Sequence, residues 1–322
     1  MTLVTLSVVK KYAARHKLTI AGIVCSLTLL WLIWRYLTAD FKSYESRRAI
    51  APGILRQCAL LTSTPQYPPR PPLSNNNNNN NNKNNEKKRR VGFFLIGTGK
   101  YLQLARQLIL SMEKYFCTRD QLSRRLVHVH YFVFTDNLEF TLDLNGEERK
   151  ENKEEEEIRS SNMSVVFQKH LTWPMSTLLR FENILRHARS LDFFATFDYL
   201  YWLDVDMKMV SHVCEDIMGD LVATMHPHYY TSAHAYPYES ENEASRAYLP
   251  QEHRYESHYF VGAFYGGNAL EMCKLLMTCD DNIQHDYKKL GGFIARVHDE
   301  SHLNRYACFH FISSCDKLFF VN

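Results

Sequence analysis

The stretch YWLDVDMKMV, residues 201–210, has the pattern of a buried strand that ends in two carboxylates. Apolar residues run to Leu203, and Asp204 and Asp206 follow with one residue between them. In a strand, residues i and i+2 point to the same face, so both carboxylates would aim at one point. Two hard oxygen ligands suit a divalent cation such as Mg²⁺ or Mn²⁺, although a strand that runs into a solvated turn has the same pattern.

The segments around this stretch alternate between the patterns of strands and helices. This alternation predicts an α/β fold, in which a parallel sheet is covered by helices and ligands bind at the carboxyl ends of strands. Asp204 and Asp206 lie at such an end. The predicted strands are residues 91–96, 126–136, 163–169 and 198–206, and the predicted helices are 102–116 and 173–190, the second with Pro174 near its start.

Length, composition and charge narrow the class of protein. The chain has 322 residues, 45% of them hydrophobic, which is enough for one large domain or two ordinary ones. A net charge of +3 argues against a nucleic-acid binder, which needs a concentrated basic face. The eight cysteines have no metal-finger spacing, and some of them can form disulfides if the chain enters the secretory pathway.

The N-terminus has the pattern of a membrane anchor. Basic residues precede an uncharged run, residues 18–34, which as a helix would span about 26 Å. We therefore expect a cytosolic tail at 1–17, a transmembrane signal-anchor at 18–37 and a lumenal remainder, in a single-pass type II arrangement in the Golgi membrane. The alternative is a cleaved signal peptide, but the apolar run is long for one and no small-x-small site clearly follows.

A tether follows the predicted anchor. Residues 38–89 are rich in proline and asparagine and cannot bury a core, so we expect a disordered stem there and a catalytic domain at 90–322. The sequence Asn162-Met163-Ser164 is an N-glycosylation acceptor that is usable if this domain is lumenal.

The second half of the chain carries three dense polar motifs, MHPHYY (225–230), HYFVGAFYGGN (258–268) and VHDESHLNRY (297–306). Each also fits an ordinary structural role, as core histidines, a turn and a helix start. His298 and His302 are four residues apart, as zinc ligands on a helix would be, but the segment is not the H-E-x-x-H motif.

Together the motifs FFLIGTGKY, HYFVFTD, WLDVDM, MHPHYY, FVGAFYGG and HDESHLNRY resemble, in this order, glycosyltransferase family 6 over residues 90–310. That family contains the ABO blood-group transferases and the α-1,3-galactosyltransferase. The resemblance implies a GT-A type nucleotide-sugar transferase fold with a mixed, mainly parallel central sheet flanked by helices. It also implies a Mn²⁺-dependent hexosyltransferase that moves galactose or N-acetylgalactosamine from UDP-galactose or UDP-N-acetylgalactosamine to a galactosyl-terminated glycan or glycolipid. The new linkage would be α-1,3, with retention of the anomeric configuration.

The same resemblance assigns roles to residues. Asp204 and Asp206 would bind the metal, and Glu300 would be the catalytic carboxylate, acting as a nucleophile or as a stabilising charge in a front-side mechanism. His226 and Glu300 would contact the acceptor. The donor would be bound by Phe94, Leu95, Ile96, Tyr101, Arg180, Asp204, Val205, Asp206, Val261, Ala263 and Asp299.

Several positions depart from the family pattern. Ala263 in place of glycine leaves less room for an N-acetyl group and favours galactose, although the smaller Val261 beside it compensates in part. Compared with the mammalian transferases of the family, the GTGKY loop is longer and Val297 stands in place of a tryptophan. Pro237 stands where the blood-group enzymes have a threonine. We therefore expect an acceptor that differs from the blood-group antigens. The C-terminus appears truncated. Two other hypotheses therefore remain open: an impaired homologue that binds UDP-sugar or glycan without turnover, and a membrane-tethered interaction protein.

Overall fold

The computed structural model describes residues 88–118, 127–142, 162–188, 191–229, 236–254, 258–310 and 312–314. The predicted tail, the predicted anchor and the stem up to residue 87 lie outside the described residues, and so does the C-terminal stretch from residue 315. Within the described ranges, no helix combines the length and the apolar composition that a membrane span requires.

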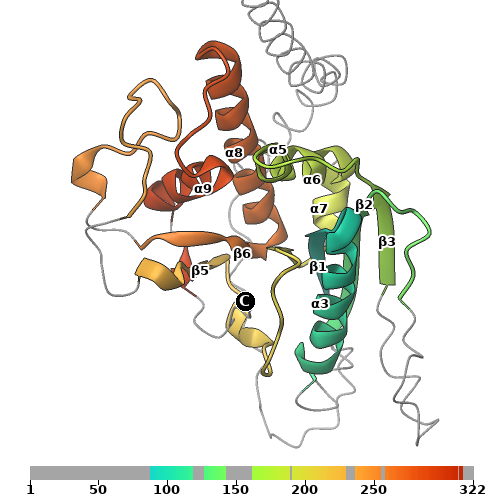
Figure 1. Cartoon of the computed structure of the whole chain (residues 1–322). Coiled ribbons are helices and arrows are strands. Elements are labelled where there is room, and N and C mark those ends of the chain that lie inside the picture. The colour runs from blue at the N-terminus through green and yellow to red at the C-terminus, as the bar shows by residue number, and fades with distance from the viewer. Residues whose placement is uncertain are drawn as a thin grey trace, which may run out of the picture. The chain divides into compact units, whose positions relative to one another are not determined.

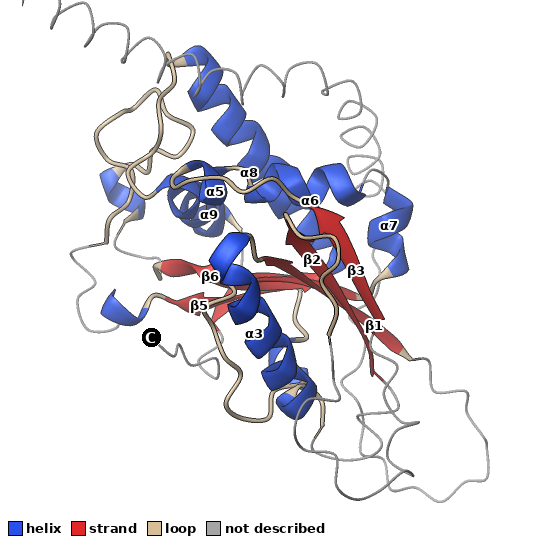
Figure 2. Ribbon diagram, turned by 45° about the vertical axis from the view of Figure 1, so that its right-hand side comes forward, coloured by secondary structure: helices blue, strands red, loops and turns tan. Residues whose placement is uncertain are grey.

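A seven-stranded sheet in the order β3-β2-β1-β4-β6-β5-β7 forms the centre of the domain (Figures 1 and 2). The first four strands in this order are parallel, β6 is antiparallel to both of its neighbours, and β7 is parallel to β5. The predicted α/β fold with a mixed, mainly parallel sheet is thereby confirmed. The strands are β1 Arg89–Ile96, β2 Val127–Thr135, β3 Asn162–Phe167, β4 Tyr199–Leu203, β5 Leu221–Met225, β6 Phe260–Asn268 and β7 Ser313–Ser314.

Helices cover both faces of this sheet. Helix α3 lies against one face, and α6, α8 and α9 lie on the other (Figures 1 and 2). The α-helices are α3 Leu102–Tyr115, α5 Met175–Leu178, α6 Arg180–Ala188, α7 Leu191–Thr196, α8 Ala269–Lys289 and α9 His298–Phe309. The 3-10 helices are η2 Gly99–Tyr101, η3 Glu215–Ile217, η4 Pro227–Tyr229 and η5 Gln251–His253.

Two predicted elements differ from the structure. The predicted helix 173–190 is two helices, because Leu179 has a ψ of 4° and ends α5 before α6 begins at Arg180. The predicted strand 198–206 ends at Leu203, because the chain turns there and the Met207 amide donates to the Asp204 carbonyl. Asp204 and Asp206 therefore lie in a turn and not on one face of a strand.

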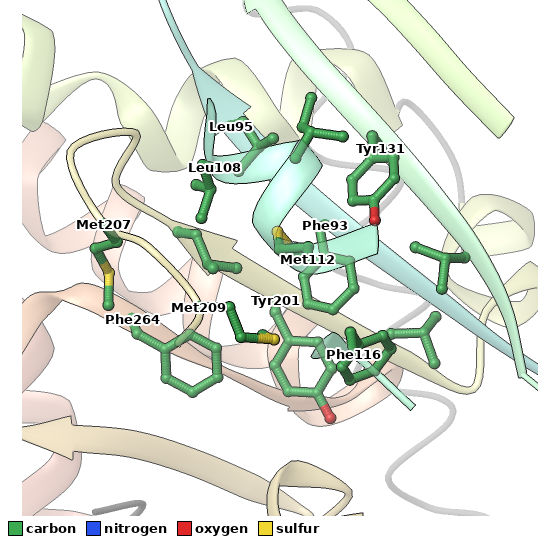
Figure 3. Packing of buried hydrophobic residues seen from close by; sticks show 14 of the residues in the cluster. Phe93, Leu95, Leu108, Met112, Phe116, Tyr131, Tyr201, Met207, Met209 and Phe264 are labelled. Carbon is green, nitrogen blue, oxygen red and sulfur yellow. The ribbon is translucent and has the colours of Figure 1, made fainter. Parts of the chain in front are cut away.

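Side chains of β1 point alternately to the two faces of the sheet, and so contact the helices on both faces. Phe93 and Leu95 point toward α3, where Leu108, Met112 and Phe116 complete the cluster (Figure 3). Phe94, which lies between Phe93 and Leu95, points to the opposite face and stacks on Phe132 of β2 at a ring-centroid distance of 5.1 Å. Side chains of both faces are thus buried, as expected for a parallel sheet between helices.

The segment after the Asp204–Asp206 turn is fixed in two ways. Met207 and Met209 are buried in the α3 cluster (Figure 3). A disulfide joins Cys117, just after α3, to Cys214, across a sequence separation of 97 residues. The turn that carries the two aspartates is consequently held at both ends, by β4 on one side and by this anchored segment on the other.

Candidate active site

A buried arginine connects the elements at the carboxyl end of β4. Arg180, the first residue of α6, is only 5% exposed. Its guanidinium donates to the Gly262 carbonyl of β6 at 2.6 Å, lies 3.3 Å from Asp204 and 3.1 Å from Asp299, and stacks on the Trp202 ring at 4.6 Å. One planar cation therefore holds together α6, β6, α9 and the turn after β4.

Carboxylates outnumber cations around this arginine. Asp204, Asp299 and Glu300 all act on the Arg180 guanidinium. Burial by itself would lower the pKa of Arg180, but the carboxylates of Asp204 and Asp299 raise it above its ordinary value. Burial also raises the pKa of Asp204 to about 6, against the opposing effect of Arg180. The excess of negative charge favours a further positive group at this point.

The two aspartates of the turn fit a divalent cation that a ligand helps to hold. Asp204 is partly buried and fixed, since its Oδ1 accepts from the Trp202 indole N–H at 3.0 Å, and Asp206 is exposed. No group of three or more histidine, cysteine or acidic side chains suited to a metal occurs in the described part of the chain. Mg²⁺-like ions are commonly held by one or two carboxylates plus substrate phosphates, and this donor set matches that arrangement.

Glu300 lies beside the arginine and is held by β6. Its Oε2 accepts from the Gly262 N–H at 2.7 Å. A Cβ added at Gly262 would lie 3.3 Å from Asp299 Oδ2 and 3.5 Å from Glu300 Oε2, so glycine permits this close approach. Burial raises the pKa of Glu300 to about 7, while the Gly262 amide lowers it.

The start of α9 is fastened to β6 by one side-chain amide. Asn304 is fully buried; its Nδ2 donates to the Phe260 carbonyl and its Oδ1 accepts from the Phe260 amide, both at 2.7 Å. The same Nδ2 donates to the Glu300 carbonyl at 2.9 Å. The spacing HDESHLN therefore places Asp299 and Glu300 toward Arg180, with Asn304 one turn further on as the attachment to β6.

The predicted nucleotide residues divide into two groups. The side chains of Phe94, Leu95 and Val205 are buried in the core, so a ligand would reach only their backbone. Ile96, at the carboxyl end of β1, and Tyr101, which is 44% exposed, have side chains that are accessible from this edge of the sheet.

The GTGKY loop is folded back on the carboxyl ends of the parallel strands. Gly99 has a φ of 54° and its N–H donates to Asp136 at 2.9 Å, while Thr98 Oγ1 and His170 Nδ1 lie 2.9 Å apart. A glycine is favoured here because residues with a side chain rarely adopt this backbone conformation.

Val261 and Ala263 flank Gly262 on β6. Ala263 is part of the α3 cluster and Val261 packs against it, so both side chains point away from the face on which Gly262 meets Asp299 and Glu300. The Ala263 carbonyl accepts from the Asp204 amide at 2.8 Å, and Ala263 is buried while Val261 is half-buried. The backbone of β6 thus joins Ala263 to the Asp204 turn and Gly262 to Glu300.

The predicted acceptor residue His226 belongs to a cluster of aromatic rings around Tyr259. Its ring centroid lies 4.6 Å from that of Tyr229 and 5.9 Å from that of Tyr259. Burial lowers the pKa of His226, with His228 adding to the effect. His226 is therefore suited to act as a neutral hydrogen-bonding partner.

The histidine pair His298 and His302 does not form a zinc site. His298 packs edge-on against Trp173 with a centroid distance of 4.6 Å. His302 is buried instead beside Asp286, with 3.9 Å between His302 Nε2 and Asp286 Oδ2. The two rings lie in different surroundings, which argues against one shared ion.

Four residues of the site were missed by the sequence reasoning, namely Trp202, Tyr259, Gly262 and Asn304. Asn304 had a usable signal, because it follows Glu300 by four residues on a helix. Trp202 and Tyr259 have the sequence pattern of ordinary buried aromatic residues, and nothing in their spacing indicates a role in the site.

Comparison with known proteins gives a consistent match. A model of glycosyltransferase family 6 matches residues 75–315. Globoside alpha-1,3-N-acetylgalactosaminyltransferase 1 of Homo sapiens is 30% identical over 226 residues, which are 70% of this chain and 57% of the human protein. Histo-blood group ABO system transferase 2 of Rattus norvegicus is 28% identical over 223 residues, 68% of this chain and 59% of the rat protein.

A bacterial relative is matched over more of its length. O-antigen biosynthesis glycosyltransferase WbnI of Escherichia coli is 28% identical over 219 residues, 67% of this chain and 81% of the bacterial protein. The matched region thus spans less than two thirds of the human and rat relatives and about four fifths of the bacterial one.

Proposed function

The chain belongs to glycosyltransferase family 6, and from this premise we propose that it is a hexosyltransferase with a GT-A type fold. It moves galactose, or N-acetylgalactosamine, from the UDP-sugar to a galactosyl-terminated glycan or glycolipid, in α-1,3 linkage and with retention. The observation that carries the proposal is the contact of Arg180 with Asp204, Asp299 and the Gly262 carbonyl, beside Glu300.

The donor diphosphate is held at the turn after β4. Asp204 and Asp206 would hold a divalent cation, Mn²⁺ in this proposal, and such an ion neutralises the charge that grows on the β-phosphate as UDP leaves. Arg180 keeps Asp204 in place and adds positive charge near the donor. Ile96 and Tyr101 lie at the edge of β1 where the uridine would bind.

The sugar is held between β6 and α9. Asp299, bound to Arg180, is placed to accept from donor hydroxyls, and Glu300 supplies the negative charge that faces the anomeric carbon. Glu300 must be ionised for this role. Because burial raises its pKa to about 7, transfer should rise with pH up to the neutral range.

Donor selection falls to Val261 and Ala263. The resemblance to the family is the basis for this: alanine in place of glycine at position 263 leaves less room for an N-acetyl group and so favours galactose over N-acetylgalactosamine.

We also propose a lumenal domain in the Golgi, anchored by the N-terminal helix. The Cys117–Cys214 disulfide supports an oxidising compartment, and Asn162, exposed at the start of β3, is open to N-glycosylation there.

The test uses the full chain in detergent with Mn²⁺. UDP release is measured from UDP-galactose and from UDP-N-acetylgalactosamine, with and without β-galactoside acceptors. Asp206→Ala should abolish release, while Lys208→Ala, an exposed change two residues away, should preserve it. UDP binding without release would indicate an impaired homologue. If a folded sample showed no UDP binding and no UDP release, the proposal would be refuted.

A further inference from the structure

Two buried carboxylates fasten the segment of residues 236–254 to the helices behind it. This segment lies beside α8 and α9 (Figure 1). Asp286, in the last turn of α8, is 1% exposed, and Glu239, within the segment, is 3% exposed. Burying a carboxylate is costly unless hydrogen bonds satisfy its oxygens, so the partners of these two groups show what each of them holds.

Asp286 holds the middle of the segment. Its Oδ1 accepts from the Arg246 amide at 2.8 Å, and its Oδ2 accepts from the Ser245 hydroxyl. The Ser245 oxygen in turn accepts from the Ala247 amide at 3.0 Å. One side chain of α8 therefore fixes three consecutive residues, and hydrogen bonds to an ionised acceptor are stronger than those between neutral groups.

Glu239 makes the reverse attachment, from the segment to the chain that leads into α9. Its Oε2 accepts from the Arg296 amide, two residues before α9, at 2.9 Å. Its Oε1 accepts from the amides of Glu241 and Asn242 at 3.0 and 3.1 Å, and its carbonyl accepts from the Leu249 amide at 3.0 Å. The start of the segment is thus tied to itself and to the helix that carries the proposed catalytic carboxylate.

The same segment supplies two rings to the aromatic cluster of His226. Tyr236 and Tyr238 have ring centroids 5.6 Å apart, and that of Tyr236 lies 5.8 Å from that of Tyr229. The Tyr229 ring lies 4.6 Å from His226, the residue predicted to contact the acceptor. Because Glu239 directly follows Tyr238, a fixed Glu239 also fixes the backbone from which both rings project.

We propose that Asp286 and Glu239 are positioning residues for the acceptor, which hold the 236–254 segment so that Tyr236 and Tyr238 complete the wall on which the galactosyl group of the acceptor binds beside His226. This inference rests on the proposed transferase function. Ligand sites commonly combine aromatic walls with a few polar groups, and this cluster has that character. The proposed donor contacts belong to other elements, namely the turn after β4 and the start of α6.

The kinetic test compares two aspartates of α8 in the full chain. Asp286→Ala removes the buried attachment, whereas Asp281→Ala removes an exposed ion pair between the same helix and Arg246. For Asp286→Ala we expect kcat/KM for β-galactoside acceptors to fall about tenfold or more, because two hydrogen bonds to a charged group are lost. Acceptor-free UDP release and the Kd of UDP with Mn²⁺ should stay within about twofold. Asp281→Ala should leave all three quantities unchanged, since exposed ion pairs contribute little.

Two milder variants separate positioning from a loss of folding. Asp286→Asn keeps an oxygen that can accept from the Arg246 amide, so it should recover part of the lost acceptor kcat/KM. Ser245→Ala removes a single hydrogen bond and should lower the acceptor kcat/KM about threefold, and it decides the test if Asp286→Ala does not fold. An unchanged acceptor kcat/KM, or equal falls with and without acceptor, would overturn the inference.

A second measurement does not need turnover. Calorimetry follows the binding of β-galactosides to the wild type and to the same variants, with UDP and Mn²⁺ present. Weaker β-galactoside binding with unchanged UDP binding supports the inference. Unchanged β-galactoside binding in the variants, or none in the wild type, overturns it. A wild type that binds β-galactosides but releases no UDP would instead refute the proposed transfer, so the two failures are distinguishable.

Discussion

The two sides of the proposed site are held together by different means. The side formed by β1, β2, β3 and β4 is a parallel sheet packed on α3, and a disulfide ties its last turn to that helix. The side formed by β6 and α9 depends on polar side chains, chiefly Asn304 and Glu300, that bond to the backbone of β6. We therefore expect the first side to resist perturbation and bind the donor, and the second to control the chemistry.

The largest expected effect separates chemistry from binding. Glu300→Gln should reduce kcat by about 10³-fold, because the neutral amide cannot oppose positive charge at the anomeric carbon. Mn²⁺-dependent UDP binding, measured by calorimetry, should change by less than about threefold, because the nucleotide contacts lie across the sheet. A parallel loss of UDP binding would mean that the two sides are not separate.

The next largest effect is expected when the attachment of α9 to β6 through Asn304 is removed. Asn304→Ala should lower the free energy of unfolding by about 3 kcal/mol, since it leaves the Phe260 amide and carbonyl buried without partners. Transfer activity should fall even though Glu300 is intact. The measurements are urea denaturation and UDP release, with the exposed Glu243→Ala as a surface reference. A free energy of unfolding equal to that of the reference variant would contradict this role of the Asn304 side-chain amide.

Removing the disulfide tests the opposite side. The double change Cys117→Ser and Cys214→Ser should destabilise the domain by about 3 kcal/mol, the usual order for loss of a native disulfide. At temperatures below the lowered melting point, the variant should retain its kcat, because neither sulfur lies near Arg180 or Glu300. A variant that stays folded but loses kcat would show that the disulfide acts on the site directly.

The pH dependence of stability should respond to a carboxyl group remote from the chemistry. Burial raises the pKa of Glu182 on α6 to about 8, with Arg186 opposing. The native state then holds a proton that the unfolded chain releases near pH 4.5, so the free energy of unfolding should fall between about pH 5 and pH 8. Glu182→Gln should reduce that fall by about 2 kcal/mol, whereas the exposed Glu243→Gln should leave it unchanged. An identical pH profile for both variants would contradict this.

The smallest effect concerns donor choice. Ala263→Gly should raise the use of UDP-N-acetylgalactosamine relative to UDP-galactose by about tenfold, the order expected for one methyl group in a tight pocket. The ratio of kcat/KM values for the two donors measures it. An unchanged ratio would shift the selection to Val261 or to another position.

The sequence predicted the parallel strands well, because β1, β2 and β4 each contain a short run of buried apolar residues. It failed at Leu179, where a ψ of 4° ends α5 before α6 begins, and at Leu203, after which the chain turns and the Met207 amide donates to the Asp204 carbonyl. The apolar and polar pattern of these segments does not mark either boundary.

The candidate site was predictable where residues carry charge. Asp204 was named from the pattern of a strand end, and Arg180, Asp299 and Glu300 were named from the family resemblance; all four lie together in the structure. The role of Trp202 was not predicted, since an aromatic residue in a strand predicts only packing until its polar atom is seen to bond to a carboxylate.

The Cys117–Cys214 disulfide closes residues 117–214 into a covalent ring, and that ring includes β2, β3, α6 and β4. Both aspartates of the turn and Arg180 belong to it, whereas Glu300 lies outside. A single proteolytic cut between residues 118 and 213 would therefore leave both fragments joined, and only reduction would release them on a gel. The donor-binding side can thus be nicked without being divided.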